Sequence, residues 1–287
     1  LIMLMLTIIW GNTFKDKRDF NKAVDVYKKT IDIKPNFADA IYNLGKALFD
    51  QDKFDEAITT YQRVLSVNPV YVKAYESMGQ ALQKKGKFAA AIDAYRKVLD
   101  VEPLNVEANN NLGIAFKEQG KLVEAVIAFN KSLSINPNCP ETFYNLGICL
   151  LEQRNHTMAE DTLYKAISLN PDYAEAHGNL AIALYEQGKL DKAINAYEKA
   201  LSLKPEYTDA QNNIGIAFQD QGKLSAAKTA YERAIMIEPY YAEAHRHLSN
   251  INKYSVNDAH LIQVKNLYNE KDITEDARCS LNFALAK

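Results

Sequence analysis

Between residues 38 and 67, apolar side chains recur every three or four residues in two successive segments, 38–51 and 54–67. This spacing places them on one face of an α-helix, so the sequence predicts two amphipathic helices in tandem. The polar connection at Asp52 and Lys53 predicts a tight turn between the helices. Proline lacks a backbone donor and restricts the residue before it, so we expect the second helix to end before Pro69.

The helix pair is repeated along the chain with a fixed period. Seven of the eight prolines stand 34 residues apart, at positions 35, 69, 103, 137, 171, 205 and 239. A period of this size indicates a repeat array in which each unit contacts only its neighbours. The predicted fold class is therefore all-α: a solenoid of about seven helix-turn-helix repeats in residues 1–241, starting at residues 4, 38, 72, 106, 140, 174 and 208. Residues 242–287 predict a partial eighth repeat and a C-terminal helical segment.

Small residues recur at two phases of the repeat. Glycine recurs at the position of Gly45, and alanine stands at the position of Ala57 in all seven repeats. Glycine inside a helix costs about 1 kcal/mol relative to alanine, so its recurrence predicts close helix approach beside large residues such as Tyr61. Glycines at the turn predict left-handed residues that end the first helix. The fifth repeat lacks this glycine, and there we expect Asn155 rather than Arg154 to adopt that conformation.

The residues Asn43, Leu44 and Gly45, with Ala57, Tyr61, Pro69 and their equivalents one period away, resemble the tetratricopeptide repeat (TPR) family. The resemblance covers about residues 4–241. It implies a right-handed, curved α-solenoid whose first helices line the inside, and it implies a protein or peptide partner.

Composition and chemistry narrow the function. The chain has 34 Lys and Arg against 36 Asp and Glu, and this net charge of −2 argues against a nucleic-acid binder. Cys139, Cys149 and Cys279 have no metal-ligand or redox spacing, and sparse cysteine favours a reducing, cytoplasmic location. The sequence carries no phosphate loop, zinc motif or nucleophile elbow, so we expect no catalytic residue, metal or cofactor. His245 and His247, two apart on a helix, are not expected to share a face.

The apolar segment 1–10 has three open interpretations. It is the first helix of a truncated or abnormal first repeat, the remnant of a signal or membrane segment, or a functional anchor. Ten residues are too few to span a bilayer, so no membrane association is expected.

One polar column is predicted on the inner face of the stack, formed by Asn43, Ser77, Asn111, Asn145, Asn179 and Asn213. A carboxamide is both a donor and an acceptor, so a row of them suits a peptide backbone. The resemblance to the TPR arm of O-GlcNAc transferase implies such a ladder. The alternative interpretation is that these residues form structural hydrogen bonds. The flanking columns are Tyr42, Glu76, Asn110, Tyr144 and Asn212 on one side, and Lys46, Gln80, Ile114, Ile148, Ile182 and Ile216 on the other. The pattern predicts a protein–protein interaction scaffold that binds an extended peptide, with its oligomeric state open.

Residues 242–287 contain AEAHRHLSNINKY, DAHLIQVKNLY and ITEDARCSLNFALAK. These segments are similar to the junction between TPR arrays and the catalytic domain in bacterial TPR–sulfotransferase proteins. The resemblance implies an alternative function, a substrate-recruiting arm of a larger transferase. Within the segment we expect a helix over 259–268 and another that begins after Thr274, whose hydroxyl would cap it.

Overall fold

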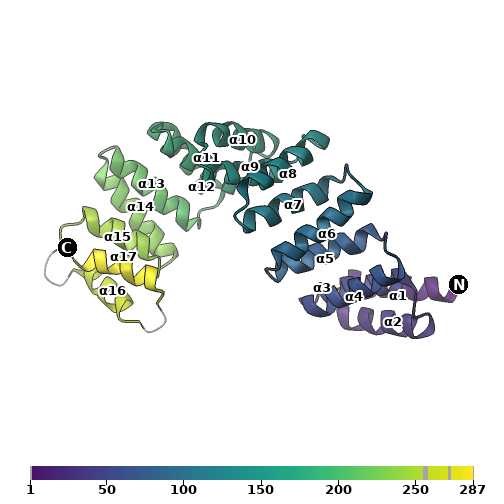
Figure 1. Ribbon diagram of the computed structural model, residues 1–287. Coiled ribbons are helices and arrows are strands. Elements are labelled where there is room, and N and C mark those ends of the chain that lie inside the picture. The colour runs from purple at the N-terminus through teal and green to yellow at the C-terminus, as the bar shows by residue number, and fades with distance from the viewer. Residues whose placement is uncertain (1, 255–257, 271–272, 287) are drawn as a thin grey trace. The chain divides into compact units, whose positions relative to one another are not determined.

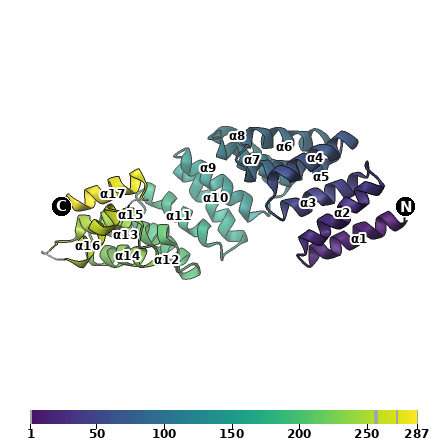
Figure 2. The same cartoon turned by 90° about the horizontal axis from the view of Figure 1, so that it is seen from below.

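The computed structural model describes residues 2–254, 258–270 and 273–286, and in these ranges the regular structure is entirely helical. The chain divides into two compact units, Leu1–Cys149 and Leu150–Lys287. From α1 to α8 (residues 2–135) and from α10 to α15 (residues 156–251), consecutive helices lie side by side as a stack of helix pairs (Figure 1 and Figure 2).

The N-terminal unit contains the pairs α1 (Ile2–Asp16) and α2 (Phe20–Ile33), α3 (Ala38–Phe49) and α4 (Phe54–Val67), α5 (Val72–Lys84) and α6 (Phe88–Val101), and α7 (Val106–Glu118) and α8 (Leu122–Ile135). Helix α9 (Pro140–Glu152) begins in this unit. As predicted, α4 ends two residues before Pro69.

The C-terminal unit contains α10 (His156–Leu169), α11 (Ala174–Glu186) and α12 (Leu190–Leu203), then α13 (Thr208–Asp220) and α14 (Leu224–Ile237), and finally α15 (Ala242–Ile251), α16 (Ala259–Tyr268) and α17 (Glu275–Leu285). The last three helices fall where the sequence predicted them, and α17 packs against both α15 and α16 (Figure 1). The Thr274 hydroxyl accepts a hydrogen bond from the Ala277 amide and caps α17, which confirms the predicted cap.

The turns inside the helix pairs require a left-handed residue. Gly86 and its three equivalents have φ between 68° and 74°, which is the conformation predicted for them. In the fifth repeat Arg154 takes this conformation, with φ of 60°, so the prediction for Asn155 was wrong. Asn155 is instead the N-cap of α10, and its side-chain oxygen accepts from the Met158 amide. The N-cap position suits asparagine, so the left-handed conformation falls to the residue before it.

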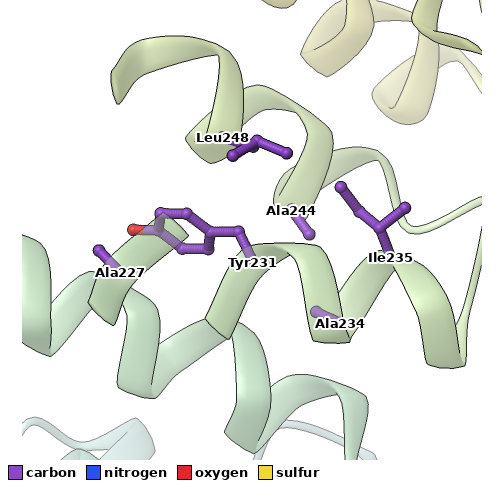
Figure 3. Packing of buried hydrophobic residues seen from close by; sticks show 6 residues of the cluster. All are labelled: Ala227, Tyr231, Ala234, Ile235, Ala244 and Leu248. Atoms are coloured by element: carbon purple, nitrogen blue, oxygen red, sulfur yellow. The ribbon is translucent and has the colours of Figure 1, made fainter. Parts of the chain in front are cut away.

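The glycines and aromatic residues predicted to pack together do meet. A Cβ atom added to Gly45 would lie 2.5 Å from the Tyr61 ring, and one added to Gly79 would lie 2.6 Å from the Tyr95 ring. Gly11, Gly113 and Gly215 face Tyr27, Phe129 and Tyr231 in the same way. The alanines at the position of Ala57 have no exposed surface in any repeat. Figure 3 shows such a core in the C-terminal unit, where Tyr231 on α14 lies among Ala227, Ala234 and Ile235 near Ala244 and Leu248 of α15.

The C-terminal helices contain a partly buried chain of hydrogen bonds. The His245 Nε2 atom lies 2.9 Å from the Pro239 carbonyl oxygen, and its Nδ1 atom lies 2.9 Å from Nε2 of His260. The two rings stack, with centroids 5.1 Å apart and planes 7° apart. The Tyr254 hydroxyl lies 2.6 Å from His260 Nδ1 and 2.6 Å from the Ser249 hydroxyl.

The hydrogen bonds constrain the tautomers of both histidines. A carbonyl oxygen only accepts, so His245 Nε2 must donate to Pro239. When His245 is neutral, its Nδ1 accepts from His260 Nε2, and the remaining nitrogen of His260 accepts from the Tyr254 hydroxyl. Burial lowers the pKa of His245, and burial followed by the neighbouring His245 lowers the pKa of His260 to about 4.

The N-terminal apolar segment forms most of α1, which packs against α2 as the first helix of a pair, in agreement with the interpretation as a first-repeat helix. The side chains of residues 1–6 and 8 lie outside the described ones. Ile9 and Trp10 are 55% and 62% exposed. No helix in the part of the chain that the structure describes is long and apolar enough to cross a membrane.

Candidate functional site

A hollow of about 630 Å³ lies across the first helices of four consecutive pairs, α1, α3, α5 and α7. We call it the N-terminal groove. Its lining is mostly polar and consists of Asn12, Lys15, Asp16, Tyr42, Asn43, Lys46, Lys73, Glu76, Ser77, Gln80 and Glu107. The repeat brings these side chains together because equivalent positions of successive first helices point the same way.

An aromatic group fixes the middle of the groove. The Tyr42 ring packs 5.3 Å from the ring of Tyr71 and 6.0 Å from that of Tyr61. Its hydroxyl lies 3.3 Å from the Ser77 hydroxyl. Tyr61 is 1% exposed, and burial raises the pKa of its hydroxyl, which stays protonated. Tyr42 is thus held from three sides beside Asn43.

Amide side chains hold two carboxylates at the α5 and α7 end of the groove. Gln80 Nε2 donates to Glu107 Oε1 at 3.0 Å. Asn105 Nδ2 donates to Glu76 Oε1 at 2.8 Å and to Glu102 Oε2 at 2.9 Å. Burial raises the pKa of Glu76 most; the hydrogen bond from Asn105 lowers it, and the charges of Glu107 and Glu102 raise it.

Lys15 on α1 and Lys46 on α3 lie toward the other end of the groove, and Lys73 lies on α5. Lys46 Nζ is 5.9 Å from the centroid of the Tyr42 ring. The ion pairs formed among the described residues do not include Lys15, Lys46 or Lys73. The groove therefore carries lysines without an ion-pair partner, and two of its carboxylates, Glu76 and Glu107, have amide partners.

The structure places the predicted column residues of the N-terminal unit in different surroundings. Asn43 and Ser77 line the groove, with Tyr42, Glu76, Lys46 and Gln80 from the predicted walls. Asn111 lines an adjoining hollow of about 530 Å³ that also includes Phe49, Phe88 and Ile114. Asn110 accepts a hydrogen bond from the Thr142 hydroxyl at 3.0 Å. Tyr144 and Asn145 lie half-buried on α9.

In the C-terminal unit the amides bond within the protein. Asn179 Nδ2 donates to the Glu175 carbonyl oxygen at 3.0 Å, and Asn213 Oδ1 accepts from Asn212 Nδ2 at 3.4 Å. Asn212 is 1% exposed, and its Oδ1 also bonds His247 Nδ1 at 2.9 Å. Asn212 thus supports Asn213 from within and does not form an open wall, which corrects that prediction. In the C-terminal unit these contacts support the alternative interpretation, in which the residues of the polar column form structural hydrogen bonds.

A family model described as the cilia and flagella-associated protein 70 C-terminal domain, a TPR model, matches residues 66–277. The chain belongs to this TPR family. A general TPR repeat model also matches residues 11–52 and 45–86. No curated protein matches the chain.

Solved structures agree with this assignment. A crystal structure of MamA has 33% sequence identity to this chain and a TM-score of 0.55, and the alignment covers 60% of this chain and 93% of the MamA chain. The C-terminal part of a TPR repeat-containing protein from Cytophaga hutchinsonii has 20% sequence identity and a TM-score of 0.68, and the alignment covers 84% of this chain and 99% of that one. YrrB, described as a TPR protein with an unusual peptide-binding site, has 23% sequence identity and a TM-score of 0.55, and the alignment covers 64% of this chain and 95% of the YrrB chain. The predicted fold class, an all-α TPR solenoid, is confirmed.

Sequence reasoning missed several groove residues of this TPR chain. Lys73 and Glu107 stand four residues before Ser77 and Asn111, so they lie on the same helix face as the polar column. That offset was the signal that could have found them. Asn12 and Lys15 were missed because their helix has an apolar start that hides the repeat pattern.

Proposed function

We propose that this TPR chain is a protein–protein interaction scaffold that binds an extended segment of a partner protein in the N-terminal groove. The observation that carries the proposal is the groove itself. It joins Asn43 and Ser77 of the polar column to a fixed aromatic ring and to both signs of charge on four successive helices.

The dimensions of the groove suit an extended chain. Packed helices lie about 8–10 Å apart, so four first helices span roughly 25–30 Å. An extended peptide rises about 3.3 Å per residue, so about eight or nine residues would cross the groove. A backbone amide and carbonyl then pass each helix, where an asparagine or serine side chain can donate or accept. YrrB, a protein of this fold with a peptide-binding site of its own, lends support.

The chemistry favours a protein or peptide partner over nucleic acid, because acidic and basic side chains nearly balance. Cys149 is buried, as a small core residue should be. The sequence holds only three cysteines, without redox or metal-ligand spacing, and this sparse use of cysteine supports a cytoplasmic location as part of the proposal.

A peptide library tests the proposal. Random twelve-residue peptides displayed on phage are selected on the immobilised chain, and one enriched peptide is synthesised with a fluorescent label. We expect replacement of both Asn43 and Ser77, the two column residues that line the groove, by alanine to weaken its binding about thirtyfold, because each lost hydrogen bond is worth about 1 kcal/mol. Asn195→Ala, at an exposed position of α12, is the control and should bind as the parent does. Failure to enrich any peptide above blank beads would contradict the proposal.

A second candidate function is the substrate-recruiting arm of a larger transferase. It is motivated by residues 242–287, which resemble the sulfotransferase junction and fold as helices α15–α17 around a core of Val264, Leu267 and Leu281. The TPR family match extends to residue 277 and so takes in most of this segment. Sequencing the reading frame past Lys287 tests the idea. A sulfotransferase domain is expected, and an immediate stop or further plain repeats would contradict it.

A further inference from the structure

The charges of the N-terminal groove are distributed unevenly along its length. Lys46 lies on α3, next to the α1 residues Lys15 and Asp16, whereas Glu107 lies on α7 and Glu76 on α5. Lys73 on α5 lies between these ends.

We propose that the bound segment is dipolar: it carries an acidic side chain that meets Lys46 and a basic side chain that meets Glu107, about six residues apart in an extended chain. This inference rests on the proposed function and specifies the class of peptide that the same groove takes.

The Lys46 end attracts a carboxylate. Lys46 is half-buried, and its ammonium group lies near the Tyr42 ring, which holds it close to the groove floor. Among the described residues it has no ion-pair partner. Asp16 is exposed and directly follows Lys15, so these two charges largely offset each other and Lys46 sets the sign.

The Glu107 end attracts a cation. Its carboxylate is held by the Gln80 amide, and the nearby Glu76 carboxylate is held by Asn105. An amide donor orients a carboxylate without neutralising it, so both negative charges remain for a ligand. Lys73 lowers the pKa of Glu76, but its effect is the smallest of those acting on that carboxyl. Lys73 and Glu107 are both exposed, so solvent screens both of their charges.

The separation of the ends sets the spacing in the peptide. Lys46 and Glu107 lie on first helices two repeats apart, on α3 and α7, with Ser77 on α5 between them. At about 8–10 Å per packed helix, the ends are roughly 16–20 Å apart. An extended chain covers this distance in about five or six residues, which leaves the intervening backbone for Asn43 and Ser77.

The test is to select the same twelve-residue phage library on the parent chain and on two charge-reversal variants. Peptides enriched on the parent should carry one acidic and one basic residue about five or six positions apart. Lys46→Glu makes both ends acidic and should enrich peptides with two basic residues. Glu107→Lys makes both ends basic and should enrich peptides with two acidic residues. This result does not depend on which way the peptide runs. Lys199→Glu on the exposed face of α12 is the matched control and should enrich the parent's peptides.

Affinities of one parent-selected peptide complete the test. Replacing its acidic residue by the neutral amide should weaken binding to the parent about three- to tenfold and leave binding to Lys46→Gln unchanged, as expected for one partly shielded ion pair. Peptides that lack the charged pair, or whose charges do not follow the two variants, would overturn this inference while leaving peptide binding intact. A library that enriches no peptide would instead overturn the proposed function.

Discussion

The contact between glycine and tyrosine inside each helix pair makes a quantitative prediction at Gly79. A methyl group added there would lie 2.6 Å from Tyr95 Cε1 and 2.7 Å from Cζ, whereas carbon atoms normally rest about 3.5–4.0 Å apart. Tyr95 has no exposed surface, and its hydroxyl donates to Gln83 Oε1 at 2.5 Å. The ring is therefore held at both ends and cannot move aside without losing that bond.

The expected cost of Gly79→Ala follows from three effects. Overpacking a buried site costs about 1–3 kcal/mol. Displacing the ring from Gln83 costs about 1 kcal/mol more. Alanine returns about 1 kcal/mol of helix propensity. We expect Gly79→Ala to lower the free energy of unfolding by about 1–3 kcal/mol. Alanine already stands at this phase in the sixth repeat, at Ala181, which favours the lower part of the range.

Urea denaturation followed by circular dichroism measures this change. Gly113→Ala is the first control, because a methyl group there meets the Phe129 ring at 2.6 Å but breaks no hydroxyl bond, so its cost should be about 1 kcal/mol smaller. Gly178→Ala is the second control, because its nearest contact, Tyr207 Cε1, is 3.0 Å away, and it should be nearly neutral. If Gly79→Ala stabilises the protein by about 1 kcal/mol, as an unobstructed helical position would, the close-contact argument is refuted.

Two further predictions concern the turn of the fifth repeat and the histidine pair. Arg154→Gly should raise the free energy of unfolding by about 1 kcal/mol in urea denaturation, because the left-handed conformation costs most residues roughly that much; no gain would show that Arg154 is unstrained there. Histidine has a pKa near 6.5 in the unfolded chain, whereas the pKa of His260 in the folded protein is about 4. The stabilisation of the α15–α17 segment by neutral His260 should therefore be fully present above pH 6.5, decrease as the pH falls toward 4, and level off below that. Hydrogen exchange of the α16 and α17 amides, followed as a function of pH, measures this change in stability. Asp258 and Lys228 also act on His260, with Asp258 raising its pKa and Lys228 lowering it. A pH profile that is the same in the His260→Phe variant as in the parent would contradict the role of this ring.

The repeat could be predicted from the sequence because its signals are local and occur seven times. The helix that ends before Pro69 and the glycines that face Tyr61 and Tyr95 follow from propensity, spacing and period alone. The choice between Arg154 and Asn155 could not be predicted, because asparagine suits both the left-handed position and the helix cap.

The candidate site was predicted only in part. The polar column located Asn43 and Ser77, but a column shows which face a residue is on and not whether its amide is already bonded. Asn179 and Asn212 are engaged by Glu175 and His247, and these contacts depend on side-chain positions that periodicity does not encode. The stacking of His245 on His260 joins α15, which is in phase with the repeat, to α16, which is not, so no repeat signal marked this pair.

Photo-crosslinking tests the central claim, that a partner segment lies along the N-terminal groove, most directly. A library-selected peptide carrying one benzoylphenylalanine is irradiated with the parent chain, and the modified residues are identified by mass spectrometry. The account predicts crosslinks on first helices at groove residues such as Tyr42, Lys46 and Gln80. Crosslinks confined to the second helices α4, α6 and α8 would contradict it.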